Sequence, residues 1–354
     1  MKWGLFAAIA VVVLEAGSAG ARETWREQSR LDLEPRDISG IEVHNARGRI
    51  EARPSADGRV HVTALKIVRA RDRDISRRLA RETLVETSRQ GGRLVIRVRY
   101  PQRHSVRINF WDSFSDISIP RVEVRIALEI PSGLPLWLNE TSGDVITENH
   151  DGRQVIKTTS GDVEVHGARG PLEVTSTSGD VSATGVERAR VSTISGDVEI
   201  AGVRGALSAS TSSGDVSVEN ARDSLTIRTT SGEVRTNGAV RGASVRTASG
   251  DIRIEGASGQ VHLGSTSGEV VVGLRDPLAR ADVETASGDI VVELAGTLAC
   301  TLDMRTSSGS IDVDLPVETR TVSRHAVTAV VRNGRTPVVL GSTSGNIQVR
   351  GGNR

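Results

Sequence analysis

Two consecutive stretches of the chain decide its fold: ARVSTISGDVEIAGVRGA at residues 189–206 and LSASTSSGDVSVENARDS at residues 207–224. Both are 18 residues long, and both carry the triplet Ser-Gly-Asp near the middle. Self-similarity at a fixed period is the signature of repeat architectures. The triplet, with variants in its third position, recurs through the C-terminal two thirds of the chain. Its glycines are Gly143, Gly161, Gly179, Gly196, Gly214, Gly232, Gly250, Gly268, Gly288, Gly309 and Gly345.

Apolar residues alternate with polar ones on both sides of each triplet glycine, which we number position 0. Positions −7, −5, +2 and +4 are mostly Val, Ile or Leu, and position +2 is Val or Ile in every copy. An alternation of period two is typical of strands with one buried face, and β-branched residues favour strands. Each repeat therefore predicts two short strands joined by a Ser-Gly-Asp corner.

A second corner is expected at position +6, where Gly or Asn recurs, because both residues tolerate a positive φ angle. A chain that makes the same left-handed corner once per repeat would show such a column. Its members are Asn149, Gly167, Gly185, Gly202, Asn220, Gly238 and Gly256.

Parallel stacking of these repeats gives an all-β fold, a single-stranded parallel β-solenoid with 18-residue coils. We expect right-handed winding, that is, a right-handed β-helix. A left-handed hexapeptide helix is the alternative, but it needs an aliphatic residue at every sixth position, whereas the apolar positions here come in pairs. The interval of 36 residues between Gly309 and Gly345 predicts one degenerate coil between them.

The N-terminal third follows the pattern less closely. Ile41, Val43, Gly48, Ile50 and Ala52 fit positions −7, −5, 0, +2 and +4 of a first coil whose triplet is lost. This coil is expected to stack on the coil that contains the first complete triplet.

An insertion is expected to follow the first coil. Strands are predicted at residues 60–64, 94–98 and 122–130. Between the first two, residues 72–90 have loosely helical spacing, and Gly91-Gly92 would end the helix.

We therefore divide the chain into a signal peptide (residues 1–21), an N-terminal coil with a small mixed capping region (22–133) and a solenoid repeat domain (134–354). A cap covers the unpaired strand groups at an open solenoid end. The degenerate stretch 316–337 is expected to do the same near the other end.

Residues 1–21 have the pattern of a cleavable secretory signal. Lys2 precedes an apolar run over residues 5–14, and Ala19-Gly20-Ala21 fits the small-residue cleavage rule before Arg22. The run is shorter than the roughly 20 residues that span a bilayer. We expect a periplasmic or extracellular protein of bacterial type without a transmembrane segment in the mature chain.

The amino-acid composition argues against several classes of protein. Aromatic residues make up 2% of the chain, and the last of them is Trp137, which indicates a thin core. The net charge of +1 gives no overall attraction to nucleic acid. The single Cys300 excludes a disulfide framework, and no cofactor-binding motif is present.

The pattern IEVHNARGRIEA at residues 41–52, followed by many copies of TxSGDVxV behind a signal peptide, resembles the bacterial secreted putative-adhesin β-solenoid domain family, a domain of unknown function. The resemblance covers about residues 31–350. It implies a β-solenoid of the cell envelope, and it implies no catalytic residues.

An acidic ladder follows from the stacked triplets, because equivalent carboxylates would lie roughly 5 Å apart. Such a row could recruit Ca²⁺, although we expect each carboxylate to accept backbone N–H groups at its own corner. Glu233 and Glu269 take the place of Asp in two triplets. The aspartates are Asp144, Asp162, Asp180, Asp197, Asp215, Asp251 and Asp289.

Hydroxyl residues form a second ladder at positions −3 and −1. We expect both to point inward and to hydrogen-bond along the stack. An ice-binding face is disfavoured, because the outward position −2 is chemically mixed.

The aromatic cluster Phe110, Trp111 and Phe114 is the third candidate. If these side chains are exposed, they would bind a partner or a membrane interface. If they are buried, they would plug the open end of the solenoid.

The function predicted from these features is a non-enzymatic, adhesin-like or structural surface in the cell envelope, with an unknown envelope protein or polysaccharide as partner. No residue is assigned a catalytic role. The alternative is a carbohydrate-active β-helix enzyme, a polysaccharide lyase or hydrolase.

Overall fold

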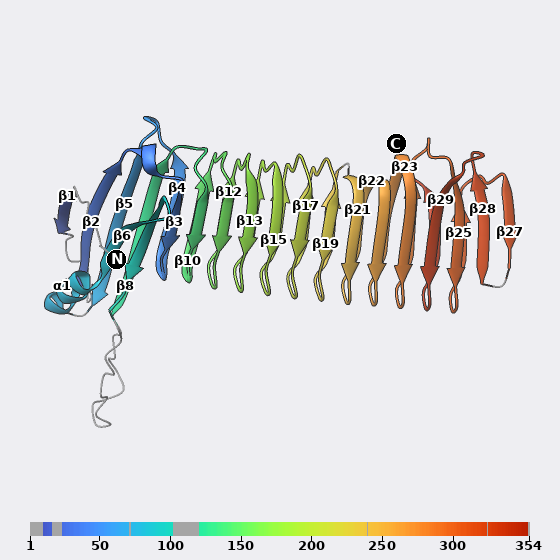
Figure 1. Cartoon of the computed structure of the whole chain (residues 1–354). Coiled ribbons are helices and arrows are strands. Elements are labelled where there is room, and N and C mark those ends of the chain that lie inside the picture. The colour runs from blue at the N-terminus through green and yellow to red at the C-terminus, as the bar shows by residue number, and fades with distance from the viewer. Residues whose placement is uncertain are drawn as a thin grey trace, which may run out of the picture. The chain divides into compact units, whose positions relative to one another are not determined.

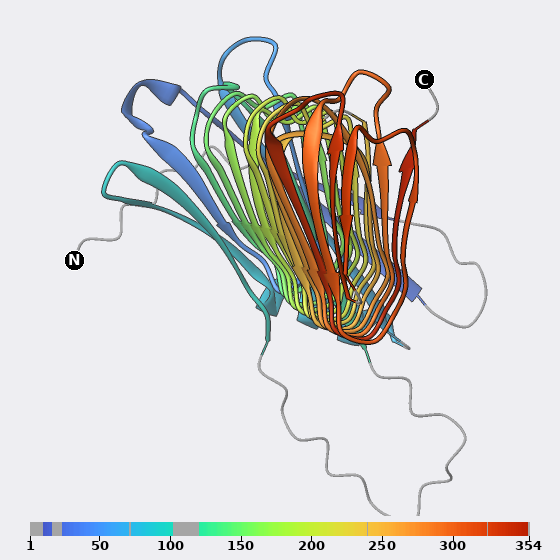
Figure 2. The ribbon, with the colours of Figure 1, turned by 90° about the vertical axis from the view of Figure 1, so that its right-hand side faces the viewer.

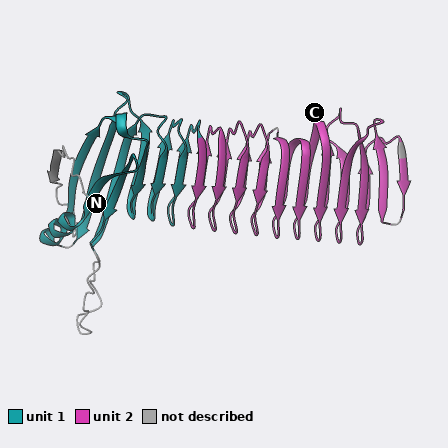
Figure 3. Ribbon diagram, in the orientation of Figure 1, with its two compact units in different colours: residues 1–170 teal, residues 171–354 magenta. Residues whose placement is uncertain are grey.

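The computed structural model divides into unit 1 (residues 1–170) and unit 2 (residues 171–354), which Figure 3 shows in different colours. Both units consist almost entirely of strands (Figure 1), as the alternation predicted. The structure describes residues 10–15, 23–70, 72–101, 120–238, 240–323 and 325–352.

The first half of unit 2 contains short strands that alternate along the chain between two layers. Within each layer, neighbouring strands pair in parallel. Val198 lies opposite Val216 in one layer, and Leu207 lies opposite Leu225 in the other. Figure 2, viewed with the C-terminal strands in front, shows the two layers. One layer holds β13 (Pro171–Thr175), β15 (Arg188–Ser192), β17 (Leu207–Ser210), β19 (Leu225–Arg228) and β21 (Val240–Thr247), and the other holds β14 (Val181–Thr184), β16 (Val198–Ala201), β18 (Val216–Glu219), β20 (Val234–Asn237) and the start of β22 (Ile252–Ser265).

The core between the layers is thin and aliphatic. The residues at positions −7, −5, +2 and +4 point inward, and Val198 and Val216 are each 1% exposed. Ile311 and Val313, on the last strand of their layer, are the partly exposed exceptions. The narrow space filled by Val, Ile, Leu and Ala accounts for the lack of aromatic residues in this half of the chain.

The triplet glycines are required by close approach between repeats. A β-carbon on Gly214 would stand 2.0 Å from the carbonyl oxygen of Gly196, and one on Gly232 would stand 1.9 Å from that of Gly214. Such distances are far inside van der Waals contact, so no other residue fits without moving the backbone. The Gly and Asn residues at position +6 are required for a different reason, which is the backbone conformation. All seven have positive φ, from 47° at Asn149 to 100° at Gly238.

The C-terminal strands are inserted between earlier ones. Val338 of β29 (Thr336–Ser342) pairs with Ala281 of β23 (Val270–Thr285) and with Leu302 of β25 (Cys300–Thr306). In the other layer, Ile347 of β30 (Ile347–Gly351) pairs with both β24 (Ile290–Leu294) and β26 (Ile311–Asp314). The repeats therefore do not stack in sequence order.

The predicted degenerate coil between Gly309 and Gly345 is wrong. This stretch forms β27 (Thr319–Val322) and β28 (Ala326–Val331), which pair antiparallel with each other. Strand β28 also pairs antiparallel with β25 and so covers its open edge, which agrees with the capping role expected for the stretch.

The first repeat of unit 1 has the register that the sequence predicted. Ile41 of β3 (Gly40–His44) pairs with Leu136 of β9 (Leu136–Asn139), and Gly48 of β4 (Arg47–Pro54) pairs with Gly143 of β10 (Ser142–Glu148). Next to these strands lie β11 (Gln154–Lys157) and β12 (Val163–His166).

The insertion in unit 1 extends both layers outward. Strand β7 (Arg93–Arg99) pairs with β3, and β8 (Arg121–Ile130) pairs with β4. Beyond β8 lie β5 (Val60–Ala70), β2 (Glu23–Leu33) and β1 (Ala10–Glu15), each antiparallel to its neighbour. A short 3₁₀ turn, Pro35–Asp37, follows β2.

The predicted helix is shorter than expected. Helix α1 (Arg73–Glu82) begins after Asp72, whose side chain accepts a hydrogen bond from the amide of Asp74. Its Ala80 packs with Val68 and Val122 of the sheet. The remainder of the predicted helix is β6 (Leu84–Gln90), because Gly91 and Gly92 make a positive-φ turn that returns the chain as β7.

The hydroxyl ladder points inward only in part. The side chains at position −3 are buried, and several bond along the stack: Thr306 Oγ1 lies 3.0 Å from the carbonyl oxygen of Gly345, and Ser265 Oγ lies 3.2 Å from that of Gly250. The serines at position −1 are exposed, contrary to our expectation, as at Ser195 and Ser213. The strand ends before the triplet, so the alternation stops there.

No helix in the described ranges is long and apolar enough to cross a membrane.

Replacing Gly214 with Ala tests the close approach. We expect a loss of about 1–3 kcal/mol or more in unfolding free energy, because the added methyl group overlaps a neighbouring backbone carbonyl. The matched control is Gly296→Ala, whose β-carbon would have nothing within 4 Å. Denaturant unfolding followed by circular dichroism measures both, and equal midpoints for the two variants would contradict this packing.

Candidate functional site

The acidic ladder of unit 2 is a row of caps on neighbouring backbone amides. Asp197 Oδ1 accepts the N–H of Asp215 at 2.9 Å, and Asp215 Oδ1 accepts the N–H of Glu233 at 2.8 Å. Asp180, Asp251 and Asp289 accept the equivalent amide at 2.9, 2.8 and 2.7 Å. We expected these bonds within each corner; they join adjacent repeats instead, because the glycines bring the corners together.

The glutamates of the ladder behave differently. Among the described residues, no such bond joins Glu233 to the amide of Asp251, or Glu269 to that of Asp289. Glu233 instead forms an ion pair with Arg235 at 2.5 Å. Asn346 replaces Asp in its triplet and still accepts the amide of Ser310 at 3.0 Å. The bond therefore needs the short side chain of Asp or Asn and does not need the charge.

The ladder aspartates of unit 1 are Asp144 and Asp162. Asp144 forms an ion pair with Arg49 at 3.0 Å. Asp162 also interacts with a neighbour. Within the described part of the chain, no group of three or more His, Cys, Asp or Glu residues is placed to hold a metal ion.

The aromatic candidates Phe110, Trp111 and Phe114 lie outside the described residues. The described aromatic residues all lie in unit 1, each next to an arginine. Arg93 lies 3.9 Å from the centre of the Trp137 ring, and Arg77 lies 5.1 Å from that of Trp25.

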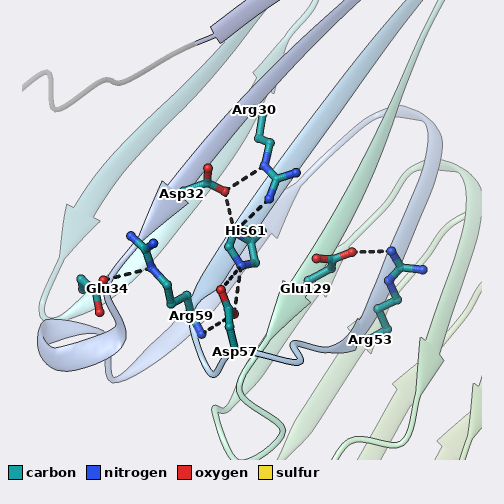
Figure 4. A network of polar contacts seen from close by, with 8 residues as sticks. All are labelled: Arg30, Asp32, Glu34, Arg53, Asp57, Arg59, His61 and Glu129. Atoms are coloured by element: carbon teal, nitrogen blue, oxygen red, sulfur yellow. Dashed lines mark hydrogen bonds and ion pairs between the residues drawn. The ribbon is translucent and has the colours of Figure 1, made fainter.

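A histidine network in unit 1 was not found from the sequence (Figure 4). His61 lies between two carboxylates: its Nδ1 is 2.5 Å from Asp32 and its Nε2 is 3.0 Å from Asp57. The hydrogen bonds with Asp32 and then Asp57 raise the pKa of His61. The hydrogen bonds with His61 and Arg30 lower the pKa of Asp32.

This network is suited to structure rather than to proton transfer. Both ring nitrogens of His61 are engaged, and the carboxylates favour its protonated form, so the ring has no free lone pair to act as a base. Asp32 is on β2 and His61 is on β5, so the contact fastens these two strands together. An ion pair of 2.9 Å between Arg59 and Glu34 adds a further contact near the same end of these strands.

A buried acid is the second feature that the sequence did not point out. Glu140 is 3% exposed, and no well-aligned hydrogen bond from the described residues reaches its carboxylate oxygens. Contacts with Asn45 and with the amides of Thr141 and Ser142 offset only part of the effect of burial on its pKa. It occupies position −3, where the following repeat has Thr158 and the preceding one has Asn45. Burial raises the pKa of Glu140 to about 7. The signal was a Glu in a column of Thr and Ser.

Two pockets are rich in arginine, one in each unit. The pocket of unit 1 has a volume of about 580 Å³ and is lined by Arg47, Arg49, Arg121 and Arg125, with Glu123 and Asp144. Both acids already have a partner, since Arg69 lies 2.9 Å from Glu123.

The pocket of unit 2 is smaller and has fewer acids. It has a volume of about 480 Å³, and its lining is Arg204, Arg222, Asp223, Arg241 and Arg275. The sequence carried a signal for it, an arginine soon after several of the Gly/Asn corners, but that arrangement was not recognised.

Comparison with known proteins identifies the family. The model described as Toastrack DUF4097 matches residues 38–237 and 223–350, so the chain belongs to this family. This confirms the resemblance to a family whose domain has no assigned function. A search of curated proteins found no match.

The solved structures that match this chain do so only weakly. A "putative adhesin" from Bacteroides fragilis is 17% identical, with a TM-score of 0.40, and the match covers 64% of this chain and 95% of that one. A "putative lipid binding protein" from Parabacteroides distasonis is 14% identical, with a TM-score of 0.31 and coverage of 93% and 97%. A "putative cell adhesion protein" from Clostridium sporogenes is 8% identical, with a TM-score of 0.21 and coverage of 92% and 100%. Likenesses this weak carry no function to the present chain.

The cap bonds predict an ordering of substitutions in the ladder. Asp215→Ala removes the acceptor for the Glu233 amide and should cost about 0.5–1.5 kcal/mol of unfolding free energy. Asp215→Asn should cost less, because Asn346 makes the same bond. Glu233→Ala, which removes no such bond, is the control. Chemical denaturation of the three variants measures the order, and a larger loss for Asn than for Ala would disprove the cap.

The buried Glu140 predicts a pH dependence of stability. Its folded pKa of about 7 lies above the ordinary value of 4.5, so the contribution of Glu140 to stability should be fully present below pH 4.5 and should be lost as the pH rises to about 7. The total effect is about 3 kcal/mol for a shift of this size. Glu140→Gln should remove this fall, while the exposed control Glu199→Gln should keep it. Unfolding measured from pH 4 to pH 8 tests this, and parallel pH profiles for the parent and Glu140→Gln would refute it.

Proposed function

We propose that this Toastrack protein is exported to the bacterial periplasm or cell surface and acts there as a non-enzymatic binding protein. One observation carries the proposal: exposed residues of the same kind lie side by side on successive repeats. In unit 2, Asp180, Asp197 and Asp215 are exposed neighbours, each bonded to the next.

Repetition of this kind suits a partner that is itself repetitive. Neighbouring strands lie about 4.8 Å apart, so equivalent groups recur at that spacing along the exposed edge of unit 2. A partner with recurring groups engages several of them at once, and each additional contact then forms at high effective concentration. The partner we propose is a polysaccharide or a protein of the cell envelope.

Export is supported by the sequence of residues 1–21, with its apolar run and the small residues before Arg22. We also propose that unit 2 is a β-solenoid of 18-residue coils with right-handed winding. The pairing of Val198 with Val216 and of Leu207 with Leu225 supports the coil length.

Expression of the full chain in a bacterial host tests the function. We expect the protein in the periplasm or medium, with Arg22 as its first residue by N-terminal sequencing. We further expect it to co-sediment with isolated cell envelopes and to leave the length of envelope polysaccharides unchanged. Retention of residues 1–21 in the cytoplasm, absence from the envelope pellet, or shortening of the polysaccharide would each contradict a stated part of the proposal.

A further inference from the structure

The arginine groove of unit 2, lined by Arg204, Arg222, Arg241, Arg275 and Asp223, has an unusual balance of charge. Its lining contains four arginines and one acid, and its volume is about 480 Å³. Among the described residues, no ion pair joins any of the four arginines to an acid. Several arginines elsewhere in unit 2 are paired with an acid, as Arg280 is with Asp282 at 2.7 Å.

Successive repeats place the first three arginines in a row. Each follows a buried residue that comes after the Gly/Asn corner: Val203 precedes Arg204, and Ala221 precedes Arg222. The amide of Arg222 donates to the carbonyl oxygen of Val203 at 3.0 Å, which fixes the spacing between the two repeats. Val240, also buried, precedes Arg241 in the same way. The inward anchors turn the arginines toward solvent, about 4.8 Å apart along the stack.

Arg275 closes the row from a later repeat. It follows the buried Leu274, which pairs with Ala257. Its Nε and Cδ atoms lie 3.5 and 3.6 Å from the point where a β-carbon of Gly256 would stand, so the glycine leaves room for the side chain. The Nε atom is buried and has no hydrogen-bond partner among the described residues.

The basic character ends at Arg275. On its other side, Arg275 borders a groove in which Glu255, Glu269 and Glu293 accompany arginines. There Glu293 and Arg350 form a 2.5 Å ion pair. The excess of arginines over acids in the arginine groove therefore does not continue into this neighbouring groove.

Guanidinium groups in a row without acidic partners repel one another. An anion bound between them would reduce this electrostatic repulsion. The planar fork of arginine binds a carboxylate through two parallel N–H···O bonds and sheds water more readily than an ammonium group does. The chain after Trp137 has no aromatic side chain on which a nucleic-acid base could stack, which disfavours single-stranded nucleic acid.

We propose that the arginine groove binds an anionic polysaccharide through carboxylate groups that recur along its chain. The proposal rests on the proposed function and narrows its partner to one chemical class. Sugar carboxylates that follow the stack would meet Arg204, Arg222 and Arg241 in turn, while Arg275 binds at the end of the row.

Calorimetric titration of the protein with sodium polygalacturonate, a uniformly carboxylated polysaccharide, tests the groove. The test variant is Arg222→Gln/Arg241→Gln, expressed from the full chain. The matched control is Arg190→Gln/Arg228→Gln, which removes the same charge from exposed strand positions outside the groove. We expect the parent and the control to bind, and the test variant to bind at least about tenfold more weakly. The variant Arg222→Lys/Arg241→Lys should bind with intermediate affinity, because it keeps the positive charges and loses the planar fork of the guanidinium group.

Four outcomes would overturn the groove assignment: equal weakening in the test and control variants, binding of neutral dextran as tight as that of polygalacturonate, binding of polyphosphate but not of polygalacturonate, or no binding by the parent. Co-sedimentation of the same proteins with cell envelopes separates the two proposals. A parent that binds envelopes but not polygalacturonate overturns the groove assignment alone. A parent that binds neither overturns the proposed function as well. Circular dichroism melting of each variant confirms that these surface changes leave the fold intact.

Discussion

The close approach of glycine backbones from neighbouring repeats is the constraint on which the structure depends. In unit 1 a β-carbon on Gly143 would stand 2.1 Å from the carbonyl oxygen of Gly48, and in unit 2 the corresponding distances are 1.9–2.2 Å. Because the corners touch, an aspartate next to the glycine reaches the amide of the next repeat. The same geometry holds acidic side chains near one another, so their negative charges repel. Each hydrogen bond from a backbone amide to an aspartate offsets part of this repulsion. The triplet glycine, the aspartate that follows it in most repeats and the inward Val or Ile at position +2 therefore act together, because the glycine sets the spacing between repeats at which the other two make their contacts.

Local periodicity was sufficient to predict most of the fold. Alternation identified the inward residues, and the Gly/Asn column identified the positive-φ corners, because both effects act within a single repeat. Even the degenerate first repeat was placed correctly, since Gly48 pairs with Gly143 as its spacing required. The order of stacking could not be predicted. Every repeat offers nearly the same edge, so the repeat of Gly345 fits beside Gly288 as well as beside Gly309, and its actual place between them depends on the hairpin β27–β28, which covers the edge of β25.

The candidate sites were predicted less well, for a related reason. The acidic ladder was visible because its residues belong to the repeat itself. Glu140, His61 and the arginine groove depart from the repeat or lie outside it, and their meaning depends on neighbours that are distant in sequence. Asp32 and Asp57 meet His61 only after β2 pairs with β5. Arg275 meets the row of Arg204 only because a glycine one repeat earlier leaves room for it.

The repeat also separates residues that the fold needs from residues that it does not. Inward positions and corners are restricted to a few residue types by packing and backbone geometry, whereas most exposed substitutions change stability by only about 0.5 kcal/mol. An exposed position is therefore the place where a sequence can change without loss of the stack. The row formed by Arg204, Arg222, Arg241 and Arg275 has no ion pair with an acid among the described residues, so these side chains add repulsion without a compensating charge. A partner that carries the opposite charge would offset this repulsion, which is the role we propose for an anionic polysaccharide in the arginine groove.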